Sequence, residues 1–357
     1  MLHETAQLIL YLSMVRYRYN LVSLPNFKYK KHTICYDFIH KFIVSKKSEN
    51  DEYNLQRELV IASIINGDVP ECYFKKSPRW ALMRDNVNKY IQTVIKNSFP
   101  NQEINIESIE CEHKAGRKNN NDLEVTVNGV HKFPLEFKFN TTSVQGCPQF
   151  VSPCKPSIFL EENFEEWFYD NYLQKIADFG GLSMPDRKIY CSTINNNKVE
   201  CMKTFKEKYK SSPEFHAMCK RTDKEAIKFF IKNSNLKVNA LSDYLQTSQK
   251  NKHYMCYYDG KFFYDKLDES LYKLNVECPV KKEPTNYIVT CENGARLEVK
   301  LRFKNGCGLQ FPAFQIKRKI PTVKQLKNIC KSNNIILPSN AKKNDIIEAL
   351  DKANVIY

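Results

Sequence analysis

The sequence predicts an α/β protein in which a mixed β-sheet is flanked by helices. Three features favour this class. Apolar residues recur at helical spacing ahead of three short strand-like segments, a second helical pattern follows those segments, and a further strand-like segment comes after it. The 357 residues are 42% hydrophobic and 12% aromatic, which excludes a largely disordered chain. This length corresponds to about two domains.

Two long helices are expected first. In residues 51–66 apolar side chains recur at spacings of three and four, and Gly67 would end the helix. Residues 80–98 repeat the pattern as far as Pro100, which cannot continue a helix.

Three strands are expected next, at residues 104–111, 123–127 and 132–139. Side chains alternate between apolar and other types along the second and third of them, as in a half-buried strand. The dipeptide Asn128-Gly129 between those two is typical of the turn of a β-hairpin.

The remaining elements complete the order helix, three strands, helix, strand. Aromatic and aliphatic side chains at spacings of three or four predict a helix over residues 164–179, before Gly180-Gly181. Residues 187–194 are expected to be the fourth strand. Residues 200–274 are predicted to be mostly helical, a helical insert that ends in a hairpin at Asp259-Gly260.

Basic residues outnumber acidic ones in this chain. There are 55 Lys and Arg against 40 Asp and Glu, a net charge of +15. The excess is concentrated in the last 57 residues, where eleven basic side chains face three acidic ones. A surface of this kind favours polyanionic partners.

The 13 cysteines fit neither a disulfide framework nor a zinc site, because they are odd in number, scattered, and show no C-x2-C spacing. They indicate a reducing compartment. The most apolar N-terminal stretch, residues 6–15, is too short to cross a membrane, and Glu4 replaces the basic start of a signal peptide. We therefore expect a soluble, intracellular protein of the cytoplasm or nucleus, with no membrane partner.

The candidate site combines Asp122 with Glu136 and Lys138. Strand alternation places Leu135 and Phe137 on one face and Glu136 and Lys138 on the other. Asp122 lies just before the apolar alternation of the preceding strand. The two acids and the lysine would then be held rigidly and directed into one cleft. A solvated strand face carrying the same residue types is the alternative.

The register of the hairpin decides whether the two acids meet. A strict two-residue turn at Asn128-Gly129 would pair residues whose numbers sum to 257 and would set Leu123 against a polar face. A sum of 258 pairs Leu123 with Leu135 and places Asp122 opposite Glu136. We predict this register, reached through a longer loop or a bulge. Opposed Cβ atoms lie about 4.5–5.5 Å apart, so two carboxylates there need a positive group, such as a divalent cation.

Hydrolysis of a phosphodiester bond suits these residue types. It needs a hard cation that binds a phosphate oxygen and lowers the pKa of a water, and Mg²⁺ prefers carboxylate oxygens. Asp122 and Glu136 would be the metal ligands, with the backbone carbonyl of Phe137 as a third, and Mn²⁺ could substitute for Mg²⁺. Lys138 would position the water or stabilise the charge that develops on phosphorus.

These residues resemble the PD-(D/E)XK nuclease superfamily, which includes many type II restriction endonucleases. Asp122 matches the first acid of the family pattern, and Glu136-Phe137-Lys138 match its E-x-K. Asn121 stands where the family often has Pro. The resemblance covers residues 50–195.

What the resemblance implies is a restriction-endonuclease-like αβββαβ core and a Mg²⁺-dependent endonuclease of the type II restriction kind, which cuts double-stranded DNA and leaves a 5′ phosphate on its product. The family often adds a glutamate from an N-terminal helix, for which Glu58 and Asp85 are the two candidates.

A second E-x-K, Glu298-Val299-Lys300, is the rival site. Its acidic partner would be Glu283 or Glu292, and neither opens a clean apolar alternation. We expect this segment to be a basic hairpin around Asn305-Gly306 that contacts DNA, with a merely solvated hairpin as the alternative. The expected DNA-binding residues of this region are Arg302, Lys304, Lys317, Arg318 and Lys319.

The end of the chain resembles a SAP-type module, a small helix–extended–helix DNA-binding fold. Residues 322–330 and 342–350 are expected to be its helices, and Asn340-Ala341 stand where the family usually has Gly. Lys342 and Lys343, at the start of the second helix, would bind phosphates beside its free amides. A helical hairpin packed on the main domain is the alternative.

We therefore expect four regions: an N-terminal extension (1–50), a nuclease core (51–199), a helical and β-hairpin DNA-contacting region (200–320) and the SAP-like module (321–357). Two other functions stay open, a repair or replication nuclease on structured DNA and a non-catalytic DNA-binding scaffold on a degenerate nuclease fold. A homodimer would suit cleavage of both strands of a symmetric site. The Lys-, Asn- and Tyr-rich composition would suit an AT-rich genome, such as that of a large DNA virus.

Overall fold

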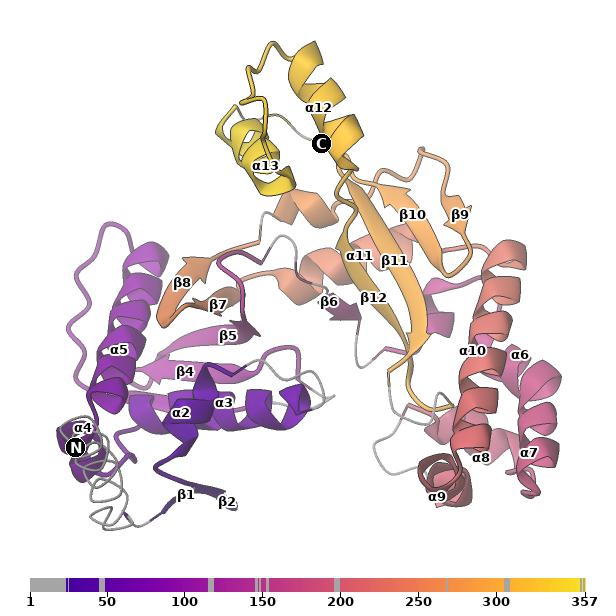
Figure 1. Ribbon diagram of the computed structural model, residues 1–357, viewed down its shortest axis with the longest axis horizontal. Coiled ribbons are helices and arrows are strands. Elements are labelled where there is room, and N and C mark those ends of the chain that lie inside the picture. Colours follow the sequence, from indigo (N-terminus) through magenta and orange to yellow (C-terminus); the bar gives the residue numbers. More distant parts are fainter. Residues whose placement is uncertain are drawn as a thin grey trace, which may run out of the picture. The chain divides into compact units, whose positions relative to one another are not determined.

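The structure, a computed structural model, describes most of the chain (Figure 1). The residues that it describes are 24, 26–44, 49–114, 119–144, 147, 149–151, 154–195, 200–267, 269–304, 309–353, 355 and 357. The apolar stretch 6–15 and the turn at Asn305-Gly306, both singled out from the sequence, lie outside them.

The chain divides into two compact units. The first comprises the residues up to Lys114, Asn121–Thr142 and His253–Asp265, and the second comprises Ala115–Asn120, Ser143–Lys252 and Lys266–Tyr357. This division differs from the expected regions. Residues 115–120 and 143–199 of the expected core belong to the second unit, and residues 253–265 of the expected DNA-contacting region belong to the first.

The first unit contains a five-stranded mixed sheet. Its strands are β3 (Ile109–His113), β4 (Leu123–Val127), β5 (His131–Phe139), β7 (His253–Tyr258) and β8 (Lys261–Asp265). The strand order is β3-β4-β5-β7-β8, in which β5 and β7 are parallel and the other neighbours are antiparallel. Because β4 and β5 bury every second side chain, they have one apolar and one polar face.

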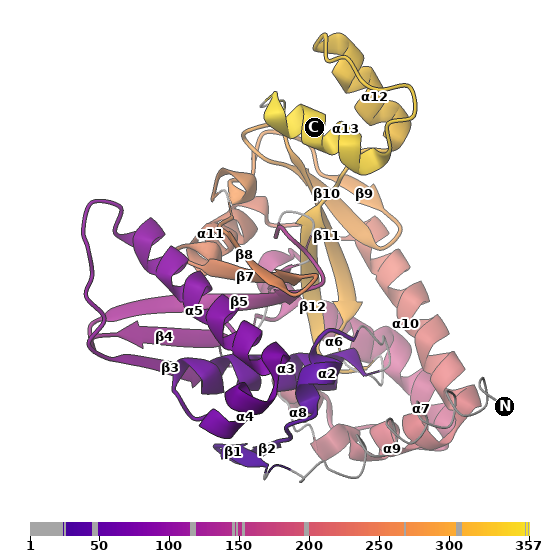
Figure 2. The same cartoon turned by 60° about the vertical axis from the view of Figure 1, so that its left-hand side comes forward.

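Helices and a small hairpin complete the first unit. They are the strands β1 (Phe27–Tyr29) and β2 (His32–Ile34) and the helices α2 (Phe38–Phe42), α3 (Asn50–Ile65), α4 (Glu71–Lys76) and α5 (Pro78–Ser98). Helix α3 packs on β3 and α5 packs on β8 (Figures 1 and 2). Side chains such as Leu59 and Val87 join Leu123 and Leu135 in one core. The two expected helices are therefore confirmed.

The fourth strand of this sheet is β7, and the prediction of a strand at residues 187–194 is wrong. Those residues form the helix α8 (Arg187–Thr193), whose first turn is capped because the side chain of Asp186 accepts a hydrogen bond from the backbone nitrogen of Ile189. Tyr190 and Ile194, four residues apart, are both fully buried. This spacing is helical. The stretch is too short for its sequence to distinguish the period of a helix from that of a strand.

The β4–β5 hairpin has the predicted register. Leu123 pairs with Leu135 and Val125 with Phe133, so that paired numbers sum to 258. The extra residue lies in a three-residue loop, Asn128 to Val130, in which Asn128 and Gly129 have φ of 52° and 69°. The longer loop supplies the adjustment, since the ladder runs without a bulge from His131 to Leu135.

The second unit contains a five-stranded antiparallel sheet with helices. Its strands are β6 (Gln149–Val151), β9 (Lys281–Glu283), β10 (Asn286–Thr290), β11 (Arg296–Phe303) and β12 (Pro312–Arg318), in the order β6-β12-β11-β10-β9. Its helices between β6 and β9 are α6 (Phe164–Phe168), α7 (Gln174–Gly180), α8, α9 (Lys203–Ser211), α10 (Pro213–Asn233) and α11 (Val238–Gln249). A π-helical turn joins α6 to α7, so residues 164–180 form the expected continuous helix. The two units together confirm the α/β class.

The C-terminal part is a helix–extended–helix arrangement formed by α12 (Val323–Ser332) and α13 (Lys343–Lys352). Thr322 and Gln325 make a capping box at the start of α12. The two helices enclose a small core of their own, formed by Leu326, Cys330, Ala341, Ile346 and Leu350. Ala341 is buried at the position where the SAP pattern has Gly.

Among the helices that the structure describes, none combines the length and the hydropathy that a bilayer crossing requires.

Candidate active site

Asp122 and Glu136 meet at the junction of β4 and β5. The backbone nitrogen of Asp122 donates to the carbonyl of Leu135 at 3.0 Å, which extends the ladder one residue beyond β4. Asp122 therefore stands opposite Glu136, as the register requires. Its Oδ2 accepts a hydrogen bond from the backbone nitrogen of Phe137 at 2.9 Å. This bond fixes the carboxylate beside β5.

Lys138 lies in the same group. Its Nζ is 2.8 Å from Oε1 of Glu136, and the two side chains are only 18% and 15% exposed. A side-chain pair two residues apart on one strand shares one face of the sheet. The ammonium is therefore held beside the carboxylates in a recessed position.

Glu58 of α3 is the third acid of the site. Burial, and after it the negative charge of Glu136, raise the pKa of Glu58 to about 8, while Lys138 lowers it. Asp85, the other candidate, lies exposed on α5. The structure therefore brings Glu58 to the expected site.

The electrostatics of the site are dominated by crowded carboxyl groups. Burial raises the pKa of Asp122 well above its ordinary value, and the charges of Glu136 and Glu58 raise it further. Lys138 and the hydrogen bond from Phe137 act in the opposite direction. Added positive charge here would favour the ionised forms of these acids.

His113, a residue not predicted from the sequence to belong to the site, holds Glu58. Its Nε2 lies 2.9 Å from Oε2 of Glu58. It was missed because the strand was expected to end at residue 111, whereas β3 runs to His113. Side chains alternate along β3, so His113 lies on the same face as Ile109 and the buried Cys111. A strand predicted to run to residue 113 would therefore have placed His113 on the core side.

The oxygen atoms of the expected metal site are of the type that binds a hard cation. Among the described residues, no group of three or more His, Cys, Asp or Glu side chains is arranged to hold a metal ion. The expected set has two carboxylates and the carbonyl of Phe137. Every second carbonyl of a strand points the same way, so this carbonyl points, like that of Leu135, toward the side of Asp122. The three oxygens are ligands of the type that Mg²⁺ prefers.

The rival E-x-K has a different environment. Oε1 of Glu298 accepts from the side-chain nitrogen of Asn286 at 2.7 Å, and Oε2 lies 3.0 Å from Nζ of Lys317. Its possible acidic partners are engaged elsewhere, Glu283 with Lys319 and Glu292 with Lys273. Glu298 is therefore part of an ion pair on the β11–β12 sheet face.

Three of the basic residues expected to bind DNA lie on or after β12 and have intramolecular partners. Lys317 pairs with Glu298 and Lys319 with Glu283. The guanidinium of Arg318 lies over the ring of Tyr357, 4.2 Å from its centre. These three basic side chains therefore already have partners within the second unit.

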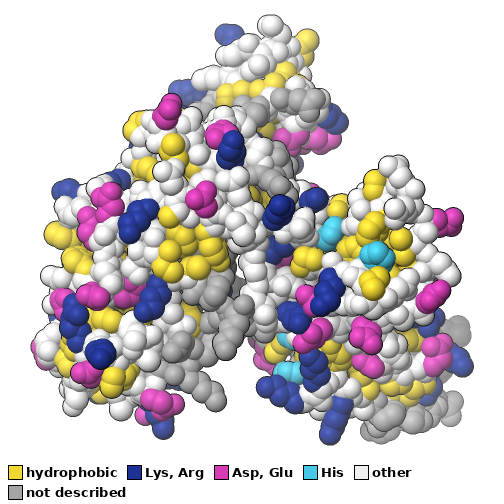
Figure 3. Space-filling view, turned by 180° about the vertical axis from the view of Figure 1, so that it is seen from behind, with side chains coloured by type: hydrophobic (Ala, Val, Ile, Leu, Met, Phe, Trp, Pro, Cys, Tyr) yellow, Lys and Arg dark blue, Asp and Glu magenta, His cyan; other side chains and the backbone are white. Residues whose placement is uncertain are grey.

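Four further residues of this expected set lie at two places in the second unit. Arg302 of β11 donates to Oε1 of Gln315 at 3.2 Å, and Lys304, just after β11, is half-buried. Lys342 is exposed at the N-cap of α13, and Lys343 is half-buried in its first turn. On the face of the molecule seen in Figure 3, basic side chains are interspersed with acidic ones.

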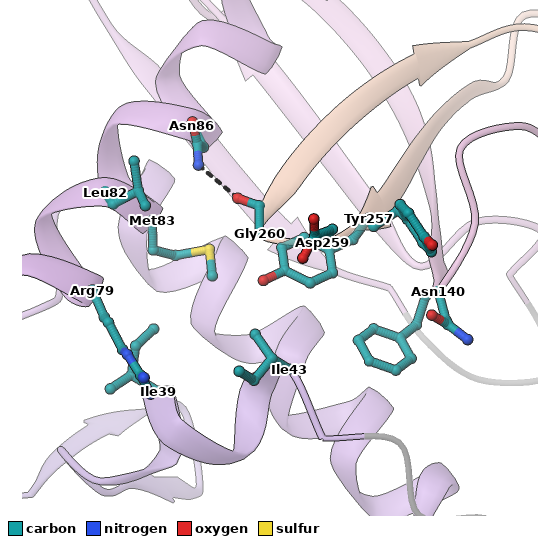
Figure 4. Close-up of a pocket in the computed structure, with 12 residues that line it drawn as sticks. Ile39, Ile43, Arg79, Leu82, Met83, Asn86, Asn140, Tyr257, Asp259 and Gly260 are labelled. Carbon is teal, nitrogen blue, oxygen red and sulfur yellow. Dashed lines mark hydrogen bonds between the residues drawn. The ribbon is translucent and has the colours of Figure 1, made fainter.

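A separate cavity of about 640 Å³ opens in the first unit. Arg79 and Leu82 of α5, Ile43 after α2, and Tyr257 and Asp259 at the end of β7 surround it (Figure 4). The Nδ2 atom of Asn86 bonds the carbonyl of Gly260 across its rim at 2.9 Å. Asp122, Glu136 and Lys138 do not line this cavity.

Comparison with known proteins gives no relative: no family model, curated protein or solved structure matches this chain.

Proposed function

We propose that the chain is a Mg²⁺-dependent DNA endonuclease of the PD-(D/E)XK type that hydrolyses phosphodiester bonds in double-stranded DNA. The observation that carries the proposal is the meeting of Asp122 and Glu136 across the β4–β5 hairpin, with the ammonium of Lys138 at 2.8 Å from Glu136. Carboxylate oxygens with an adjacent ammonium are the groups that phosphodiester hydrolysis needs.

Each residue has a distinct role in the proposed reaction. Asp122, Glu136 and the carbonyl of Phe137 would hold the cation, which when bound supplies positive charge to the phosphate and lowers the pKa of water. Lys138 would orient the attacking water or stabilise charge on the phosphate. Glu58 would be the third acid of the site, and its contact with His113 at 2.9 Å would fix its position.

DNA would be held by the basic residues of the second unit. The expected contacts from Arg302, Lys304, Lys342 and Lys343, with the partly paired lysines of β12, bind phosphates and carry no sequence information. A homodimer would let two such sites cut both strands of a symmetric sequence.

Digestion of plasmid DNA tests the proposal. Wild-type protein with Mg²⁺ should give discrete fragments and none in EDTA, and Glu136→Ala should abolish cleavage. Glu124→Ala is the matched control, because Glu124 lies on β4 two residues from Asp122 and pairs with Lys114 at 3.5 Å. Equal cleavage by wild type and Glu136→Ala would refute the site.

A non-catalytic DNA-binding scaffold is the second candidate. The observation that favours it is that, in the part of the chain that the structure describes, no three side chains of metal-ligand type form a metal site. Retention of duplex DNA without cuts in Mg²⁺ or Mn²⁺ would support this scaffold. Nicking restricted to branched DNA would support a repair nuclease instead.

A further inference from the structure

Helix α10 carries a row of lysines that winds about a third of the way around its surface. Lys220, Lys224, Lys228 and Lys232 follow one another at intervals of four residues, and all four are exposed. Residues four apart are neighbours on a helix surface, and each step advances about 6 Å along the axis. The four ammonium groups therefore form a row of about 18 Å.

Glu225 is the one acid among the exposed residues of 220–232, and it does not pair with these lysines. In the part of the chain that the structure describes, no carboxylate lies within ion-pair distance of these four lysines. Lys282 of β9 extends the row at the end of α10, where its Nζ lies 3.0 Å from Oδ1 of Asn235. Like charges at this spacing destabilise a helix, so the row has a cost for folding.

An exposed aromatic ring lies beside the last of these lysines. Phe229 of α10 is 55% exposed, and its ring stacks on Trp167 of α6 with centres 6.0 Å apart and planes within 9°. Phe229 is three residues from Lys232, so the two side chains are neighbours on the helix surface. Figures 1 and 2 show α10 running alongside α6 and α7.

We propose that the surface of α10 that winds from Lys220 past Lys224 and Lys228 to Lys232 and the Phe229–Trp167 pair binds single-stranded nucleic acid. A row of ammonium groups follows a phosphate backbone, and a half-exposed stacked ring accepts an unstacked base. A duplex keeps its bases stacked inside and would use the lysines alone. The row repeats at a spacing similar to that of successive phosphates in an extended strand.

The surface is independent of the acids of the first unit, so it can be tested without cleavage. Binding of fluorescent dT20, rU20 and a 20-base-pair duplex is measured by anisotropy in EDTA over a range of salt. The row variant carries Lys220→Gln, Lys224→Gln, Lys228→Gln and Lys232→Gln. The matched control carries Lys75→Gln, Lys76→Gln, Lys89→Gln and Lys96→Gln, which removes four exposed lysines from the first unit.

The row variant should bind dT20 at least tenfold more weakly, and its salt slope should fall by about 3, because each contact with a single strand contributes about 0.7. The control should keep the wild-type slope. Phe229→Ala should weaken dT20 binding about tenfold, and Phe229→Tyr should restore it. A ratio of dT20 to rU20 affinity shows whether the surface prefers DNA or RNA, and either preference supports it.

Three results would overturn the inference. One is an equal loss in the row and control variants, which would mean that only net charge matters. Another is a Phe229→Ala variant that binds dT20 as the wild type does. The third is binding to phosphatidylserine vesicles that falls with the row variant while binding to dT20 does not, which would assign the face to a membrane surface. Failure of plasmid cleavage leaves this inference untouched, because the two measurements use different surfaces and conditions.

Discussion

The Nε2 atom of His113 lies 2.9 Å from Oε2 of Glu58. Burial raises the pKa of Glu58 and lowers that of His113. Both shifts favour the neutral forms, so this contact is a hydrogen bond between uncharged groups near neutral pH rather than an ion pair. It joins α3 to the last residue of β3 and thereby fixes the position of the third acid of the site.

Replacement of His113 should therefore destabilise the protein. His113→Leu leaves the buried carboxyl of Glu58 without this partner, and we expect the free energy of unfolding in urea to fall by about 1–3 kcal/mol. His113→Gln, which keeps a polar group, should lose less. His32→Leu, which removes a half-buried histidine from β2, is the control. Equal losses in the two leucine variants would mean that the bond to Glu58 contributes nothing specific.

Two single-residue deletions in the β4–β5 hairpin should have opposite results. Val130 lies in the loop and is 71% exposed, while Lys132 lies within β5. Deleting Val130 leaves Asn128-Gly129 as a two-residue turn, the preferred hairpin connection, and keeps Leu123 opposite Leu135.

Deleting Lys132 instead moves every later residue of β5 by one position. Leu135 and Phe137 would then turn to the polar face, at a cost of about 1.5–3 kcal/mol each. We expect cooperative thermal unfolding near the wild-type temperature for the Val130 deletion and a strongly destabilised or unfolded protein for the Lys132 deletion, measured by circular dichroism. Equal melting temperatures would contradict the register argument.

The β4–β5 hairpin also shows which features can be predicted from the sequence. Its register follows from local information, since alternation fixes which residues share a face and only one pairing sets Leu123 against Leu135. The same locality made the β7–β8 hairpin at Asp259-Gly260 predictable, and both residues have positive φ there. The meeting of Asp122 with Glu136 was predictable for the same reason.

The features that could not be predicted depend on contacts between residues far apart in the sequence, or on segments whose pattern fits both a helix and a strand. β7 pairs in parallel with β5 although Phe139 and His253 are more than 100 residues apart, and a parallel pairing leaves no turn signal in the sequence. Residues 187–194 were misassigned because a stretch this short fits both periods. The position of Glu58 depended on the packing of α3 against β3, which periodicity alone does not give.

Replacing Arg57, next to Glu58, should lower the free energy of unfolding more than replacing Arg84, another arginine of the first unit. It is fully buried and donates to the carbonyls of Phe42 at 2.8 Å and Val44 at 2.6 Å, and its guanidinium lies 3.4 Å from the centre of the Phe139 ring. Arg57→Met leaves both carbonyls unsatisfied, and we expect a loss of about 3 kcal/mol in urea unfolding.

Arg84 provides the control for this measurement. It is partly exposed and pairs with Glu71 at 3.1 Å, and exposed pairs contribute about 0–1 kcal/mol. Arg84→Met should therefore stay within about 1 kcal/mol of the wild type. A loss from Arg57→Met no larger than that from Arg84→Met would show that the buried hydrogen bonds do not hold the end of α2.

Asp223 of α10 should make the stability depend on pH. Burial raises the pKa of Asp223 to about 8, against smaller opposing effects of Lys220 and Arg302. Between its ordinary pKa of 3.8 and 8, the folded state keeps a proton that the unfolded chain releases. The folded state therefore binds more protons in this window, and the free energy of unfolding falls as the pH rises through it.

Asp223→Asn removes this titration. The stability of the variant relative to wild type should rise by on the order of 3–4 kcal/mol between pH 5 and pH 8, measured by urea unfolding at each pH. Asp243→Asn, which changes an exposed residue of α11, should leave that pH dependence as it is in the wild type. If Asp223→Asn and wild type instead kept a constant difference from pH 5 to pH 8, the carboxyl would ionise in the folded protein as readily as in the unfolded chain, and its burial would carry no electrostatic cost.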